Sequence, residues 1–211
     1  MAVYDLQEQE QIDALKAWWQ DNKKFVVSIV TITLVGLAGY KGWKYWKNEQ
    51  SAKAAVEFES LQQSVQQKNL AKAQQHKNAL LTNYSESAYA GRGVLIISSA
   101  EIEAGKLNDA TTDLQWLIQN SKELPIQDVA RLRLASLKLD QKKFDEALSN
   151  LNAITTDGLK GLVSFQKGDV LLAKNDKAGA KTSFRLALEQ LDQADPLRSV
   201  VEMKIDSLGG L

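Results

Sequence analysis

The stretch "ASLKLDQKKFDEALSNL", residues 135–151, carries the pattern that decides the fold. Ala135 is followed nine positions later by Phe144, three further on by Ala147, and four beyond that by Leu151. Steps of three and four residues place side chains on one face of an α-helix. A small residue where two antiparallel helices cross lets them approach closely, and larger apolar residues fill the groove around it. The stretch therefore predicts a tightly packed helix pair.

The same pattern returns along the rest of the chain. Three further phrases align with it: "KNLAKAQQHKNAL" from Lys68, "GKLNDATTDLQWLI" from Gly105 and "NDKAGAKTSFRLAL" from Asn175. The anchoring alanines, at positions 73, 110, 147 and 180, are 37, 37 and 33 residues apart. Pairs of this length cannot bury their apolar faces alone, so we expect successive pairs to stack into a solenoid. The final "ADPLRSVVEMKIDSL" predicts a capping helix on the last pair.

These spacings resemble the tetratricopeptide repeat, in which a small residue, an aromatic residue, an alanine and a large apolar residue follow one another at the same intervals. The resemblance implies an all-α domain of stacked helix pairs, and a generic helical array is the alternative. One copy departs from the pattern. Lys77 stands where the other copies have Leu114, Leu151 and Phe184, so we expect an irregular first repeat.

A second informative stretch, "KKFVVSIVTITLVGLAGYKGWKYWK", covers residues 23–47. Its uncharged core, residues 25–40, spans roughly 24 Å as a helix, short of the ~30 Å hydrocarbon layer of a bilayer. Aromatic side chains that prefer membrane interfaces flank the core on both sides, and lysines follow it. We therefore predict a retained single-pass anchor with these membrane and interface residues: Trp18, Trp19, Phe25, Leu34, Tyr40, Trp43 and Trp46.

Two alternatives to an anchor are a cleaved signal peptide and a buried core helix. The long, acid-rich segment before the apolar run is atypical of signal peptides, although Gly36-Leu37-Ala38 has the small residues of a cleavage site. The expected organisation is an amphipathic segment at 1–22, the anchor at 23–47 and a repeat domain at 48–211. Lysines on both sides of the span leave its orientation undecided.

Composition and motifs argue against several function classes. Basic and acidic residues number 26 each, so charge does not favour nucleic acid as a partner. Cysteine is absent, which excludes disulfides, thiolate metal sites and cysteine nucleophiles. His76 is the only histidine, has no second metal ligand, and is expected to be a solvated surface residue. We find no catalytic or phosphate-binding motif and therefore expect no enzymatic activity, no metal and no cofactor.

Protein binding remains the expected function. Solenoids present a concave face formed mainly by the first helix of each pair. Candidate groove residues on these helices are Arg92, Leu95, Val129, Leu132, Leu162 and Phe165. Core packing explains most of the apolar residues equally well, since these helices are apolar nearly all round. An apolar groove for unfolded or extended chains is the functional interpretation.

Taken with "WWQDNKKFVVSIVTITLVGLAGYKGWKYWKNEQ" from Trp18, the whole chain resembles the YfgM family of ancillary subunits of the bacterial Sec translocon. The resemblance implies an inner-membrane protein with a cytoplasmic N-terminus and a periplasmic repeat domain. Implied partners are the SecYEG channel, the prolyl isomerase PpiD and unfolded secretory chains, which would be passed to periplasmic chaperones. The alternative is a membrane-anchored scaffold for one folded partner in envelope assembly or stress signalling.

Overall fold

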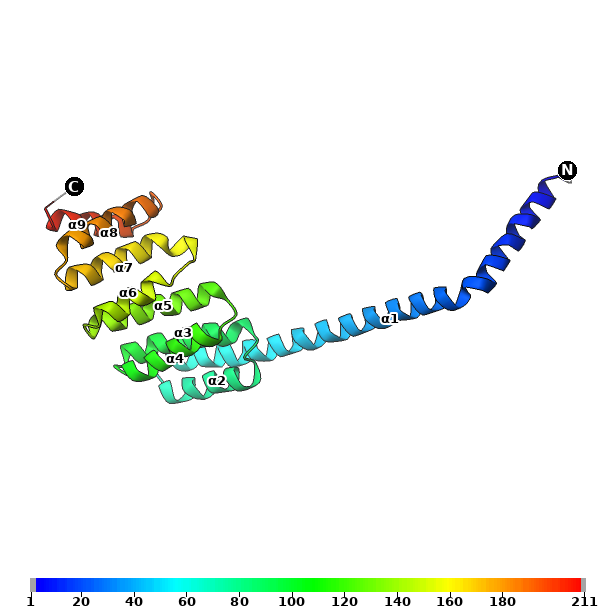
Figure 1. The fold of residues 1–211 in the computed structure, drawn as a ribbon. Helices are drawn as coiled ribbons and strands as arrows, with labels where there is room; N and C mark the ends of the chain where they lie inside the picture. Colours follow the sequence, from blue (N-terminus) through cyan, green and yellow to red (C-terminus); the bar gives the residue numbers. More distant parts are fainter. Residues whose placement is uncertain (1–2, 210–211) are drawn as a thin grey trace. The chain divides into compact units, whose positions relative to one another are not determined.

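A computed structural model describes residues 3–209 of the chain (Figure 1). Every regular element in that range is helical, which confirms the predicted all-α class. The elements are α1 (Val3–Gln66), α2 (Leu70–Asn83), α3 (Ala88–Glu103), α4 (Leu107–Asn120), α5 (Leu124–Asp140), α6 (Phe144–Asn152), the short 3₁₀ helix η1 (Asp157–Leu159), α7 (Lys160–Ala173), α8 (Lys177–Gln190) and α9 (Leu197–Ser207).

The chain divides into two compact units, Met1–Ala52 and Lys53–Leu211. Helix α1 forms the described part of the first unit and continues without a break to Gln66. Its last part, from Lys53 to Gln66, is the first helix of the second unit. The predicted segment 1–22 begins with two residues outside the described range, and no helix end marks its boundary with the anchor. No proline interrupts α1, so nothing in the sequence forces the helix to stop there.

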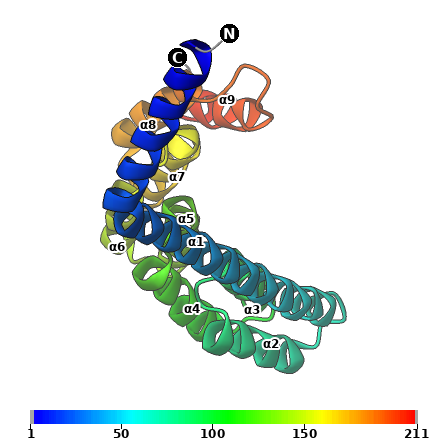
Figure 2. The same cartoon turned by 90° about the vertical axis from the view of Figure 1, so that its right-hand side faces the viewer.

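The second unit consists of helix pairs in the predicted order. The end of α1 pairs with α2, α3 with α4, α5 with α6, and α7 with α8, and α9 follows as a cap. Figure 2 shows this unit as an arc, with α4, α6 and α8 on its outer side and α3, α5 and α7 on its inner side. The repeats therefore place the first helix of each pair on the concave side, as in a solenoid.

Close helix crossings occur at the predicted alanines. Ala73, Ala110, Ala147 and Ala180 are all fully buried. The tightest approach is in the last pair, where a β-carbon added to Gly168 would lie 2.4 Å from the ring of Phe184. Small residues are therefore required where the paired helices meet.

The turn inside each pair repeats as well. Lys68, Gly105, Lys142 and Asn175 all have φ between 56° and 73°, the left-handed region. In each case the next amide donates a hydrogen bond of 2.8–2.9 Å to a carbonyl in the last turn of the first helix, which closes that helix. Glycine, the residue that adopts this conformation most easily, occupies only one of these four positions, so three of the turns form with other residues.

The C-terminal helix α9 covers the last pair. Val201 and Ile205 are buried in a cluster with Phe184 of α8. On the same helix, the ammonium of Lys204 lies 2.5 Å from Asp169 of α7 and 5.4 Å from the ring centre of Phe165. This arrangement confirms the predicted capping helix and closes the apolar end of the stack.

Candidate functional site

The six candidate groove residues lie on α3, α5 and α7, two on each helix. Leu95 and Leu132 are buried within two different core clusters. Val129, Leu162 and Phe165 are half-buried, and each packs against a different cluster. The structure therefore places the six residues on successive first helices, and the five apolar ones pack in or against the core clusters.

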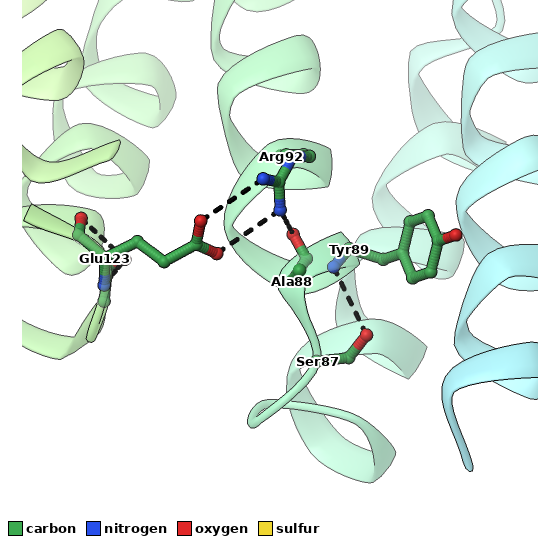
Figure 3. A network of polar contacts seen from close by, with 6 residues as sticks. Ser87, Ala88, Tyr89, Arg92 and Glu123 are labelled. Atoms are coloured by element: carbon green, nitrogen blue, oxygen red, sulfur yellow. Dashed lines mark hydrogen bonds and ion pairs between the residues drawn. The ribbon is translucent and has the colours of Figure 1, made fainter. Parts of the chain in front are cut away.

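Arg92 is held by partners inside the protein. Its guanidinium donates to both carboxylate oxygens of Glu123, at 3.2 and 3.3 Å, and to the carbonyl of Ala88 at 2.7 Å (Figure 3). The ring of Tyr89 points to the opposite side of α3, and its centre lies 5.3 Å from that of the Phe58 ring of α1 at a tilt of 43°. Arg92 thus links α3 to the start of α5, the next first helix.

Clefts on the repeat unit are lined by a mixture of polar and apolar side chains. One of about 370 Å³ lies between α4, α5 and α6. Ile118 and Leu134 are its apolar members, and amide, hydroxyl and charged side chains form the rest. Large apolar side chains exposed on the repeat unit are few and dispersed: Val56, Leu124, Leu186 and Met203. An exposed surface for partners is therefore mostly polar with isolated apolar contacts.

The seven predicted anchor and interface residues are all solvent-exposed in α1, with exposed fractions between 47% and 68%. Among the described residues, α1 is the one helix long and apolar enough to cross a membrane, and none of its most apolar stretch is buried. A helix in a soluble core would bury such side chains. Near the end of this stretch, the Lys47 ammonium lies 5.2 Å from the ring centre of Trp43.

A buried charge cluster joins the first two repeats and was not predicted. Lys77 of α2 donates from its ammonium to both carboxylate oxygens of Asp113 on α4, each at 2.8 Å. Glu101 of α3 is 1% exposed and accepts a 3.1 Å hydrogen bond from Gln74, while its second oxygen has no partner. Burial, followed by the charge of Asp113, raises the pKa of Glu101 above its ordinary value. Burial likewise raises the pKa of Asp113, against the lowering effect of Lys77.

A second unpredicted contact fastens α5 to the loop after α6. Asp128 is fully buried and accepts hydrogen bonds from the amides of Thr155 and Thr156 and from the Thr156 hydroxyl, at 3.0, 2.9 and 2.7 Å. Burial alone would raise the pKa of Asp128, but these hydrogen bonds and nearby Arg131 together lower it. The carboxylate is therefore ionised and holds the loop in place.

His76 differs from the prediction. Its ring nitrogen Nδ1 lies 2.8 Å from Glu57 of α1, and the side chain is 22% exposed. The prediction of a solvated surface histidine was wrong because α1 extends into the repeat unit and packs beside α2. Among the described residues, no group of three or more His, Asp or Glu side chains has the arrangement of a metal site.

The chain is similar to known proteins over almost its whole length. It is 29% identical to the ancillary SecYEG translocon subunit of Haemophilus influenzae over 98% of this chain and 100% of that protein. It is also 29% identical to the protein of the same name from Neisseria gonorrhoeae, over 96% and 98% of the two chains. The relative from Escherichia coli is 27% identical over 59% of this chain and 60% of its own.

A family model described as a tetratricopeptide repeat-like domain matches residues 16–210. This range contains the complete set of helix pairs and the cap, together with most of α1. The four buried alanines and the recurrent left-handed turns are the structural counterpart of that match. The chain therefore belongs to the tetratricopeptide repeat-like family that includes proteins named ancillary SecYEG translocon subunit.

Proposed function

We propose that this protein is a non-enzymatic ancillary subunit of the Sec translocon, anchored in the bacterial inner membrane by α1. The observation that carries the proposal is the match to ancillary SecYEG translocon subunits over at least 96% of this chain in two species. The exposed apolar stretch of α1 supports an anchor, and the helical repeats support protein binding rather than catalysis.

In this proposal, residues 23–47 span the membrane, the N-terminal segment is cytoplasmic and the repeat domain from residue 48 is periplasmic. The repeat domain binds secretory chains as they emerge from SecYEG and helps transfer them to periplasmic chaperones, with PpiD as a partner. Anchoring beside the channel raises the effective concentration of a weak binding surface. Weak binding suits the observed surface, because few large apolar side chains of the repeat unit are exposed.

Site-specific photocrosslinking in intact cells tests the proposal. Photoreactive residues are placed at Leu34 in the apolar stretch and at Leu186 and Met203 on the repeat unit, all three of which are exposed. Leu117 is the matched control, because its side chain is fully buried. We expect translocon adducts from Leu34, many secretory-chain adducts from the two repeat positions, and none from the control.

Other outcomes separate the alternatives. One discrete adduct at the repeat positions, with none at Leu34, would favour a scaffold that recognises a single folded envelope partner. Absence of translocon adducts from every position would contradict the proposed Sec association.

The orientation is tested separately by attaching a periplasm-active reporter enzyme after residue 211. This reporter must be active if the repeat domain is periplasmic.

A further inference from the structure

Glu101 is the least compensated charge in the core of the repeat unit. Its side chain is almost fully buried on α3, and one of its carboxylate oxygens has no hydrogen-bond partner. The other oxygen accepts from the neutral amide of Gln74. A buried carboxylate with a free oxygen is costly when ionised, because it has lost water without gaining a full set of donors.

The surrounding charges do not neutralise an ionised Glu101. From α4, Asp113 and Asp109 face it with negative charge, and from α2, Lys77 supplies the positive charge. That ammonium is already committed to both oxygens of Asp113. From α5, the guanidinium of Arg133 donates to the carbonyl of Leu95 and the hydroxyl of Ser98 on the same face of α3, rather than to Glu101.

One ammonium therefore serves two buried carboxylates. If both were ionised, the cluster would hold an uncompensated negative charge in a medium of low polarity. A proton on the carboxyl that lacks the ammonium removes this charge and converts the free oxygen into a donor. The carboxylate of Asp113 is an acceptor within hydrogen-bonding reach of Glu101.

We propose that Glu101 is protonated at neutral pH, donates a hydrogen bond to Asp113, and makes the junction between the first two repeats less stable as pH rises. The proposal is independent of the proposed association with SecYEG. Protonation links three helices through one network: α2 through Lys77, α3 through Glu101 and α4 through Asp113.

The direction of the pH effect follows from linkage. A group that binds its proton more tightly when folded stabilises the fold at low pH, and this contribution is lost as pH rises through its folded pKa. Between the unfolded and folded pKa values of Glu101, the population of the opened junction rises about tenfold per pH unit. The effect is confined to the first repeats, because repeats in a solenoid contact only their neighbours.

Hydrogen exchange on the full-length protein in detergent micelles measures this effect. We expect protection factors of α2 and α3 to fall between pH 5 and pH 8, whereas those of α8 stay constant. Glu101→Gln keeps the size and the acceptor for Gln74 while removing the charge, so it should weaken the pH dependence and leave only the contribution of Asp113. Glu103→Gln is the matched control, since Glu103 lies exposed on the same helix and should behave as wild type.

A wild-type protein with pH-independent protection of α2 and α3 would overturn the proposal, as would loss of protection in Glu101→Gln at neutral pH. A second measurement does not depend on the folding of that variant. Infrared spectra of the wild-type protein with isotope-labelled glutamate should show a protonated carboxyl band at pH 7 that disappears at alkaline pH. Absence of this band at pH 7 would show that Glu101 is ionised.

Discussion

Replacing Asp128 with alanine tests how the third repeat holds its irregular loop. The substitution removes three hydrogen bonds, from two backbone amides and one hydroxyl of Thr155 and Thr156, to a fully buried carboxylate. A hydrogen bond to a charged group contributes about 1.5–3 kcal/mol to stability. Thr155 is exposed and Thr156 is half-buried, so water replaces part of what is lost. We therefore expect a destabilisation of about 3 kcal/mol, well below the sum of three such bonds.

The same residue predicts an acid-dependent loss of stability. Because the pKa of Asp128 is lowered in the folded protein, its contribution is present above the unfolded value of about 3.9 and is lost as pH falls through the folded value. Urea unfolding of the full chain in mild detergent, at pH 7 and at pH 3, measures both effects. The stability difference between wild type and Asp128→Ala should shrink at pH 3.

Asp145→Asn is the matched control for this experiment. Its carboxylate is 88% exposed and pairs only with a surface lysine, so we expect a change within about 0.5 kcal/mol. A stability of Asp128→Ala equal to that of the control at pH 7 would refute the assigned role of the three hydrogen bonds. A difference that grows in acid would refute the assigned ionisation state.

Three further substitutions test the repeat junctions and turns by urea unfolding. Lys77→Met leaves Asp113 buried without its cation and should cost about 3–5 kcal/mol, whereas adding Asp113→Leu should recover much of this loss. Gly168→Ala places a β-carbon 2.4 Å from the ring of Phe184 and should cost about 1–3 kcal/mol. Lys142→Gly relieves a non-glycine residue at φ 59° and should stabilise by about 1 kcal/mol.

Two of these substitutions, Gly168→Ala and Lys142→Gly, have a matched control in the chain. Gly158→Ala should be nearly neutral, because its β-carbon would meet no atom within 4 Å. Lys143→Gly lies in the same turn as Lys142 but at φ −90°, so it should bring no stabilisation. For Lys77, a single variant as stable as wild type would contradict the buried ion pair. If Gly168→Ala and Gly158→Ala changed stability equally, the packing reason given for Gly168 would be contradicted. If Lys142→Gly and Lys143→Gly changed stability equally, the backbone reason given for Lys142 would be contradicted.

The repeat architecture was predictable because it depends on residue size at fixed intervals. The alanines at positions 73, 110, 147 and 180 mark the close crossings in the sequence and are fully buried in the structure. The length of α1 was not predicted. The composition changes from polar to apolar near residue 22 and back to polar near residue 47, but such a change decides whether a helix lies in lipid or in water and does not end the helix. Helix ends depend on caps and breakers, and this segment has no proline.

The sequence indicated only part of the two buried polar clusters. Lys77 was identifiable as a misfit at an apolar position, but its partner lies 36 residues away on the next repeat. Likewise, Asp128 gave no signal, since its partners are mainly backbone amides of a loop. Pattern analysis finds positions that must be apolar or small, whereas a buried charge is explained only when the side chains from several helices are placed together.

This distinction bears on where partners can bind. An inner helix of a solenoid packs against neighbours on both sides, so most of its large apolar residues are needed for the core, as Leu95 and Leu132 demonstrate. What remains exposed on the repeat unit is polar, with single apolar side chains such as Leu186 and Met203. A surface of this kind does not support tight binding by itself, since affinity comes mainly from clustered, fully desolvated anchors. Anchoring at the membrane is therefore central to the proposed role, because it supplies the local concentration that the surface requires.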